Sequence, residues 1–400
     1  MTGKTCRRYA RVGAPVSATR LEPITHFLTG ACLGRAGLNR RTALATATLT
    51  LASEAPDLDV LGQIRGPVFG FAHHRGFTHS FLGVPLLAAL VLIFIYLFWR
   101  MRGRRSNIPG LPPRWGVLYL YACLAGLIHI LLDFTNNYGV RPWWPFSERW
   151  YSWDIVFIVE PLMLVLLVGA LLVPTLLSLI HEEIGAEVSP WRGRTAAIIA
   201  LAGIAVLWVL RDFEHRRAVA ALESRTYQDA DPIRVSAFPY WLNPFRWSGV
   251  VETKNFFAVM WVDSRRPEVD PENRMEIRYK PEETRITLAA KQSYLGRVYL
   301  DWAQYPILES FELPPPGAGY AVEFLDLRYH YPGRLSAPLS AGVILNRNLK
   351  VEAEFFGPRL RRPAKESNSR LCPSCSPSAR RAALALSAFG ARSRNGFMRP

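Results

Sequence analysis

The stretch SFLGVPLLAALVLIFIYLFW, residues 80–99, contains no charged residue. Twenty such residues in an α-helix are about 30 Å long, which is the thickness of the hydrocarbon core of a bilayer. Uncharged runs of this length seldom occur in the cores of soluble proteins, so the stretch predicts a membrane-spanning helix. We therefore expect an integral membrane protein.

Three further apolar runs favour a polytopic membrane domain rather than a soluble bundle of core helices. Residues 155–180 are interrupted only by Glu160, residues 116–132 contain one ionisable group, His129, and residues 195–210 are uncharged. We predict four membrane helices from these runs. Residues 42–53 are uncharged but too few to cross a bilayer, so we expect a buried or re-entrant helix there.

The net charge of +16 comes mostly from the two ends of the chain. Residues 1–20 contain five basic and no acidic residues, and residues 357–400 contain ten basic and one acidic residue, which leaves +2 for everything between them. We read these ends as a basic N-terminal extension and a disordered basic tail. No basic groove is indicated, so no nucleic acid is expected as a partner.

The charges of the loops predict how the chain crosses the membrane. The loop after residue 99 contains five arginines and no acidic residue up to Arg114, which favours a cytoplasmic position. The loop 133–154 and everything after residue 210 would then lie on the outer side. The chain is therefore expected to cross the membrane several times.

Beyond residue 230 the pattern changes to short alternating segments, which are typical of strands. The expected strands are residues 256–262, 276–279, 285–288, 320–324 and 350–355. The predicted fold is mainly α: a helical membrane domain over residues 21–212, a small extramembrane antiparallel β domain over 230–356, and the tail from 357.

Residues with metal-binding side chains gather around the ends of the first apolar runs. His129 and Asp133 are four residues apart, so they share one face of a helix, and His73 is either a further ligand or a bystander to His74. Such groups are costly in lipid and should face a polar cavity or a ligand. The candidate ligands are His26, Asp57, Asp59, His74, His79, His129 and Asp133.

Imidazole nitrogens combined with carboxylate oxygens favour zinc, with manganese or iron as alternatives. Seven donors exceed the needs of one tetrahedral ion, so two or three divalent metal ions are expected. Such ions can activate a water for hydrolysis, with Asp57 or Asp59 accepting its proton. Arg75 would be a suitable partner for a phosphate group.

At these residues the sequence resembles the bacterial membrane-bound metal-dependent hydrolases, the LexA-binding, inner-membrane-associated YdjM-like family. The resemblance covers roughly residues 22–145 and rests on four motifs, of which HRGFTHS, residues 74–80, is the most specific. The others are His26 with Gly30, Pro56 to Asp59, and the segment from His129 to Gly139. The resemblance implies a helical membrane hydrolase, distantly similar to zinc-dependent phospholipase C and zinc single-strand nucleases, with the seven residues above as metal ligands.

The hypothesis is a membrane-bound, metal-dependent phosphoester hydrolase that acts on a membrane lipid or a lipid-linked substrate. The alternative is a membrane scaffold or regulator with a structural metal site, for which the β domain and the basic tail would bind partners or anionic lipid. A transporter is disfavoured because the chain has no internal repeat. The substrate and the oligomeric state are left open by the sequence.

Overall fold

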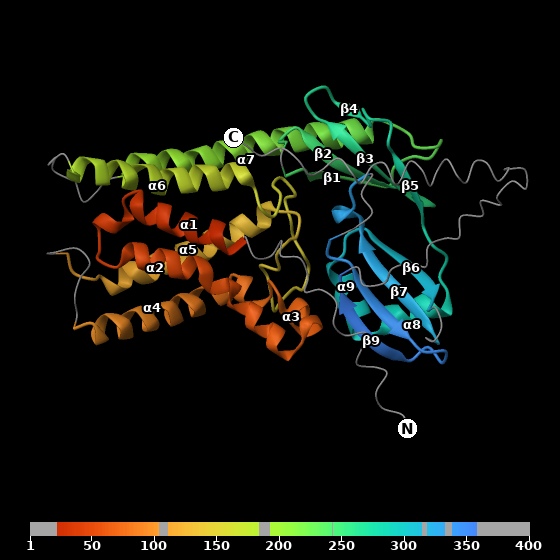
Figure 1. Cartoon of the computed structure of the whole chain (residues 1–400), viewed down its shortest axis with the longest axis horizontal. Helices are drawn as coiled ribbons and strands as arrows, with labels where there is room; N and C mark the ends of the chain where they lie inside the picture. The colour runs from red at the N-terminus through yellow and green to blue at the C-terminus, as the bar shows by residue number, and fades with distance from the viewer. Residues whose placement is uncertain are drawn as a thin grey trace, which may run out of the picture. The chain divides into compact units, whose positions relative to one another are not determined.

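The computed structural model describes residues 22–103, 111–183, 193–241, 243–313, 318–332 and 338–357, and of residues 22 and 178–183 it describes the backbone alone. The predicted N-terminal extension, and the predicted tail apart from Gly357, lie outside these residues. Within them the predicted fold class is confirmed: a helical domain comes first and antiparallel sheets follow (Figure 1).

The helical domain consists of long helices joined by short helical segments. Its α-helices are α1 (Glu22–Arg35), α2 (Ala45–Glu54), α3 (Pro67–His73), α4 (Gly83–Met101), α5 (Trp115–Thr135), α6 (Pro161–Glu183) and α7 (Arg194–Glu223). The 3-10 helices are η3 (Leu38–Arg40), η4 (Ala55–Arg65) and η5 (Phe77–His79). Helices α4, α5 and α7 are long and apolar enough to cross a membrane, and residues Pro161–Leu177 of α6 form a shorter apolar helix. Three of the four predicted crossings are therefore confirmed by length and composition.

Helices α1 and α2 form a tightly packed hairpin inside this domain. A Cβ added at Gly30 would lie 2.6 Å from Ser53 Oγ, and one at Gly34 would lie 2.6 Å from Thr46 Oγ1. The two glycines are one helical turn apart, so α1 presents a groove into which α2 fits. The predicted buried helix at 42–53 corresponds to α2.

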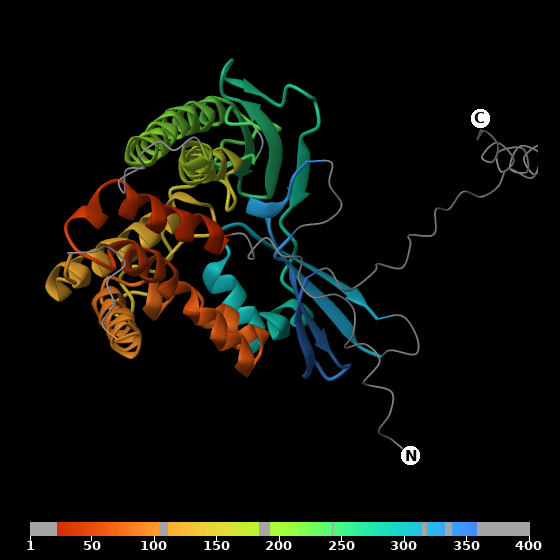
Figure 2. The ribbon, with the colours of Figure 1, turned by 60° about the vertical axis from the view of Figure 1, so that its left-hand side comes forward.

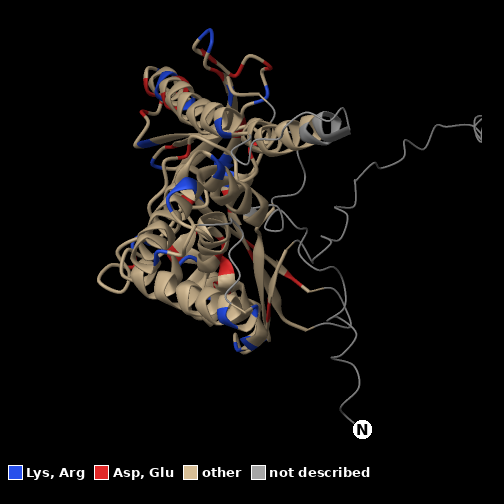
Figure 3. Cartoon of the chain, turned by 90° about the vertical axis from the view of Figure 1, so that its left-hand side faces the viewer, with Lys and Arg blue, Asp and Glu red and all other residues tan. Residues whose placement is uncertain are grey.

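The turn between α1 and α2 lies at the end of the bundle that is far from the β domain. There the Arg114 amide donates to Thr42 Oγ1 at 2.7 Å, and Arg194 Nε donates to the Ala36 carbonyl at 3.1 Å. Exposed arginines recur at this end, including Arg41 and Arg102. Figure 3 views the molecule from this side and shows basic residues among the helix ends.

The part of the chain after α7, here called the β domain, contains two antiparallel sheets and two α-helices. The first sheet has the order β1-β2-β3-β4, with β5 also paired to β3, and the second has the order β6-β7-β8-β9. The bounds are β1 (Arg234–Pro239), β2 (Arg246–Glu252), β3 (Phe256–Asp263), β4 (Glu268–Val269), β5 (Glu276–Tyr279), α8 (Arg285–Gln292), α9 (Tyr294–Trp302), β6 (Pro306–Glu312), β7 (Tyr320–Asp326), the 3-10 helix η6 (Leu327–Tyr329), β8 (Ala341–Leu345) and β9 (Val351–Phe356).

One predicted strand is wrong, because residues 285–288 begin helix α8. Thr284 caps this helix: its hydroxyl accepts from the Thr287 amide, and its own amide donates to Thr287 Oγ1. This capping box stabilises the helix start more specifically than four alternating residues can favour a strand. The buried residues of α8, Thr287 and Ala290, are three apart, as a helix requires.

Both sheets pack against the rest of the chain through apolar residues. The first sheet packs on the end of α7, where Ala218 and Leu222 contact a core that includes Trp247. The second sheet, with α8 and α9, packs around Trp302 and reaches Tyr138 in the loop after α5. Figure 2 shows the two sheets lying beside the helical domain. Their contacts are therefore concentrated at the end of the bundle where α5 ends.

Candidate metal centre

The predicted ligands come together at this end of the helical domain, from four separate segments. The first turns of α1 contribute His26, and η4 contributes Asp57 and Asp59. The segment between α3 and α4 contributes His74 and His79, and the last two turns of α5 contribute His129 and Asp133. His26, His79, His129 and Asp133 are all at most 3 % exposed. Because buried polar groups need partners, such a concentration requires mutual contacts or a bound ion.

Asp57, His79, His129 and Asp133 place one ligand atom each within 4.8 Å of one another. His79 Nε2 lies 3.5 Å from Asp57 Oδ1 and 3.2 Å from Asp133 Oδ2. His129 Nε2 lies 3.6 Å and 3.3 Å from the same two atoms, and 3.0 Å from His79 Nε2. Ligands about 2.0–2.2 Å from a tetrahedral ion are about 3.3–3.6 Å apart. These spacings are close to the edges of such a tetrahedron.

Contacts behind the two histidine rings hold both Nε2 atoms toward the centre. His129 Nδ1 lies 2.7 Å from the Ser53 carbonyl, which can only accept, so Nδ1 carries the proton. His79 Nδ1 lies 3.0 Å from Thr78 Oγ1 and 3.5 Å from Asp59 Oδ2. A backbone or carboxylate partner of this kind fixes the ring orientation of metal-ligating histidines.

The other three predicted ligands lie around this group rather than in it. His26 Nε2 is 3.3 Å from Asp133 Oδ1, and its ring stacks on that of His129 with 3.8 Å between centroids. His74 Nδ1 is 3.1 Å from Asp59 Oδ1, so these two form a separate pair behind His79. His73 points away, with its Nδ1 2.9 Å from the Phe69 carbonyl.

Arg75 is buried between the two parts of the site. Its backbone amide donates to Asp59 Oδ2 at 2.8 Å, and its NH2 donates to Asp133 Oδ1 at 2.8 Å. Its NH1 donates to Asn136 Oδ1 at 3.2 Å and to the Gly139 carbonyl at 3.0 Å. Arg75 has a φ of 52°, a strained value for a residue other than glycine. The guanidinium is thus fixed on the carboxylate of a predicted ligand.

The two aspartates of η4 are held in the ionised form. Burial by itself raises the pKa of Asp59, but the adjacent His74 and His79 and the Arg75 amide outweigh it and lower the pKa. Burial likewise opposes ionisation of Asp57, and its contact with His79 and the nearby His129 and His26 lower its pKa below the usual range. Both carboxylates are therefore negatively charged at neutral pH, which is the form that binds a cation.

A small pocket adjoins the cluster on the side of α1 and α6. Among its lining residues are Thr25 and His26 of α1, Asp133 at the end of α5, Asn136, and Met163 of α6. Two of the predicted ligands, His26 and Asp133, thus line this pocket.

Sequence reasoning missed two contributors to the centre. The Ser53 carbonyl leaves no side-chain signature, because any residue supplies a carbonyl. Asn136 lies three residues after Asp133, within the motif from His129 to Gly139. This position is the only feature of the sequence that could have indicated its role.

Comparison with known proteins agrees with this architecture. Residues 21–218 match the family model described as YdjM inner membrane protein. The helical part of the chain belongs to the YdjM family. The chain is accordingly an inner-membrane protein, in agreement with its long apolar helices.

The YdjM match includes every predicted ligand and ends within α7, before the first sheet. The chain is also similar to the uncharacterized protein YfhP of Bacillus subtilis (strain 168), with 24 % identity over 343 residues, covering 83 % of this chain and 94 % of that protein. This alignment is longer than the YdjM match, so it includes much of the β domain. No solved structure matches the chain.

Proposed function

We propose that this protein is a membrane-bound, metal-dependent hydrolase of phosphoesters. The observation that carries the proposal is the convergence of Asp57, His79, His129 and Asp133 on one point, with both Nε2 atoms directed inward. Nitrogen and carboxylate ligands of this kind suit zinc, with manganese or iron as alternatives. A bound ion of this class supplies a water of lowered pKa and an electrophilic partner for phosphoryl oxygen.

Asp57 is the better candidate for the residue that takes up the proton of the water. Its side chain is 20 % exposed, whereas that of Asp59 is 6 % exposed. Asp57 Oδ2 is hydrogen-bonded to no described residue, while the oxygens of Asp59 accept from His74, Arg75 and Thr78. Asp57 therefore has an oxygen available for a proton, and Asp59 orients its neighbours.

Arg75 contributes positive charge close to the reacting centre. Its guanidinium holds Asp133 in place and balances the carboxylates around the ion. We also propose that Arg75 contacts the phosphate group of the substrate.

The surface beside Asp57 favours a lipid or a lipid-linked substrate. Leu58, Leu61 and Ile64 of η4 are exposed, Ile64 to 84 %. Phe81 and Leu82 are also exposed, and they lead directly into the apolar surface of α4. A site at the end of membrane helices, beside such residues, can receive a phosphoester headgroup while the acyl chains stay in the bilayer.

The second candidate function is a scaffold or regulator in which the ion is purely structural. One observation favours it: four protein ligands would complete a tetrahedral site and leave no position for water. A hydrolase needs a coordination position that is open to water, and a purely structural site has none.

Phosphodiesterase activity of the purified protein tests the proposal. We expect hydrolysis of bis(p-nitrophenyl) phosphate or a fluorogenic phospholipid in detergent micelles, dependent on added zinc or manganese. Asp57→Asn should lower kcat at least 100-fold, and His73→Ala, whose ring points away, should not. Tight metal binding by the wild type, with no hydrolysis of either substrate and no exchangeable water ligand, would favour the structural site instead.

A further inference from the structure

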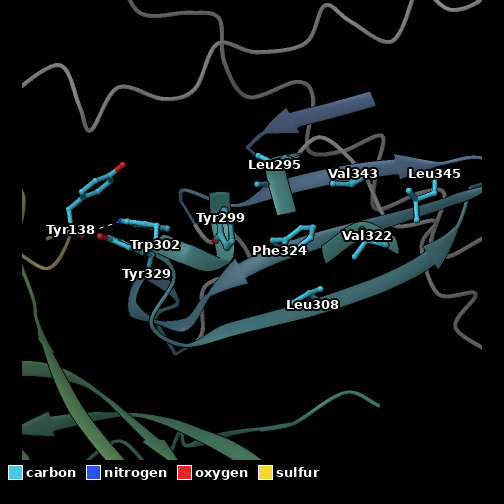
Figure 4. Packing of buried hydrophobic residues seen from close by; sticks show 12 residues of the cluster. Tyr138, Leu295, Tyr299, Trp302, Leu308, Val322, Phe324, Tyr329, Val343 and Leu345 are labelled. Atoms are coloured by element: carbon cyan, nitrogen blue, oxygen red, sulfur yellow. Dashed lines mark hydrogen bonds between the residues drawn. The ribbon is translucent and has the colours of Figure 1, made fainter. Parts of the chain in front are cut away.

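The β domain forms three hydrogen bonds to two consecutive backbone carbonyls of the helical domain. Arg328 NH1 and the Tyr329 hydroxyl donate to the Asn137 carbonyl at 2.9 and 3.1 Å. Trp302 Nε1 donates to the Tyr138 carbonyl at 3.1 Å, as Figure 4 shows. All three donors are at most 2 % exposed, so water does not replace these bonds in the folded protein.

Arg328 is prepared for this contact by its own domain. Its Nε donates to Asp326 Oδ2 at 2.9 Å, and its NH2 donates to the Trp302 carbonyl at 3.0 Å. Its guanidinium also lies over the Trp302 ring, 4.4 Å from the centroid. A buried arginine is costly unless its charge and its donors are matched, and here both conditions are met.

The two carbonyls belong to the turn that holds Arg75. Asn136, directly before them, accepts from Arg75 NH1 through Oδ1, and the same oxygen accepts from the Tyr138 amide at 2.8 Å. Gly139, directly after them, accepts from Arg75 NH1 through its carbonyl. The Tyr138 ring lies under the Arg75 guanidinium, 4.8 Å from its centroid.

A continuous series of contacts therefore runs from the β domain to a predicted metal ligand. It begins at Arg328 and Trp302, passes through residues 136–139 to Arg75, and ends at Asp133, to which Arg75 NH2 donates at 2.8 Å. The series uses backbone carbonyls, so a shift of the turn would move Asn136 and Gly139 together.

We propose that the extramembrane β domain is a structural part of the metal centre, and that Arg328, Trp302 and Tyr329 are positioning residues for Arg75 and, through it, for Asp133. This inference rests on the metal centre of the proposed function but not on hydrolysis. It assigns a role to a domain that lies outside the YdjM match.

Two conservative variants test it, each with a matched control. Tyr329→Phe removes only the hydroxyl that binds the turn, and Tyr299→Phe removes a hydroxyl of the same core that donates to Leu339 within the β domain at 3.0 Å. Trp302→Phe removes the indole donor to Tyr138, and Trp247→Phe removes a buried indole donor to Ser264 Oγ within the β domain at 3.2 Å.

The measurements are the zinc dissociation constant, the absorption spectrum of the cobalt-substituted protein, and the Tm of the metal-free protein. We expect the double variant Tyr329→Phe/Trp302→Phe to weaken zinc binding about threefold to tenfold. This is less than the roughly 10–100-fold typical of residues that bond a metal ligand directly, because these two act through Arg75. Its cobalt spectrum should shift, and the double control should change neither property, even if both pairs lower Tm equally.

The proposal is overturned if the double variant keeps the wild-type zinc affinity and cobalt spectrum, or if the double control weakens binding as much. A wild type that binds neither ion would overturn both this inference and the proposed function. A wild type that binds zinc in the predicted manner but hydrolyses nothing would leave this inference standing and remove only the hydrolase.

Discussion

His79 and His129 bring their Nε2 atoms within 3.0 Å of each other in a fully buried position. With Nδ1 of His129 bonded to the Ser53 carbonyl, the Nε2 of that ring carries a lone pair. Such a lone pair, beside a second ring nitrogen and two carboxylates, is repelled unless a cation or a proton lies between them. The side chains are thus arranged for a cation before one binds.

At the residue scale, the first prediction concerns Asp59. Asp59→Asn keeps the shape of the side chain but removes the charge that faces His74 and His79. We expect zinc binding to weaken about tenfold, the effect of losing a group that orients a ligand. A competition titration against a chelator measures this, with His73→Ala as the control. If Asp59→Asn loses zinc as completely as Asp57→Asn does, Asp59 is a direct ligand, and a second ion is held by Asp59 and His74.

The sequence could predict which residues would come together. It could not predict which of them form the inner four-ligand group and which form the separate Asp59–His74 pair. The i, i+4 spacing of His129 and Asp133 and the density of histidines around residues 73–79 pointed to a shared site. The separation of the Asp59–His74 pair from the inner group depends on the turn at Arg75, whose positive φ has no sequence signature outside glycine. The four-ligand group therefore emerges only from the fold.

At the scale of elements, the contact between α1 and α2 sets the position of His26. His26 is four residues before Gly30, so it lies on the helix face that packs on α2. The Gly30 Cα faces Thr50 and Ser53 too closely for a side chain. The early His–Gly motif thus has a physical reason: the glycine lets α1 approach, and the approach brings His26 to Asp133.

The second prediction follows from this packing. Gly30→Ala should lower the free energy of unfolding by about 1–3 kcal/mol, because the added methyl forces the two backbones apart. It should also weaken zinc binding, since His26 moves with α1. Gly169→Ala in α6, where an added Cβ meets nothing within 4 Å, is the matched control and should be neutral or stabilising. Equal stability of the two variants in detergent would show that the hairpin is not closely packed.

The third prediction concerns pH and the loop that leads to α6. Burial raises the pKa of Asp154 to about 6, although Arg328 and a hydrogen bond from Ser152 oppose the shift. A carboxyl whose pKa is higher in the folded state contributes its full stability below its unfolded pKa, near 4, and loses it as pH rises through about 6. Asp154→Asn should thus leave Tm unchanged near pH 4 and stabilise the protein by about 1–3 kcal/mol above pH 6. A stabilisation that is the same at every pH would contradict this assignment.

The type of a secondary-structure element could be predicted where its hydrophobic pattern was long. Predictions from short patterns were unreliable. The runs of α4 and α5 are uncharged over nearly their whole length, so no other structure satisfies their backbone in a membrane. The prediction of a strand at residues 285–288 depended on only four alternating residues. The capping box at Thr284 stabilises a helix there instead. Helix α6 begins at Pro161, later than the apolar run at 155, because residues 155 and 156 bond to the chain at Thr135.

At the scale of the whole molecule, the β domain lies at one end of the long helices (Figure 1). The centre lies at the same end, since α4 begins just after His79, and the exposed Arg102 follows the other end of α4. The charge bias of loops predicts that the arginine end is cytoplasmic. The centre would then open at the outer face of the inner membrane.

The fourth prediction tests this orientation with single cysteines in a cysteine-free background. Tyr279, in β5, is exposed, and so is Arg102, after α4. A membrane-impermeant maleimide added to cells with a permeabilised outer envelope should label Tyr279→Cys and leave Arg102→Cys unlabelled until the inner membrane is disrupted. Labelling of Arg102→Cys alone would reverse the orientation and place the centre in the cytoplasm.

The metal content of the purified protein tests the central claim most directly. After equilibration with buffered zinc in detergent, elemental analysis should find at least one ion bound per chain of wild type, and none retained at the same free zinc by a His79→Ala/His129→Ala variant that remains folded by circular dichroism. A wild type without bound ion under zinc, manganese and iron, or a double variant with undiminished content, would contradict the account.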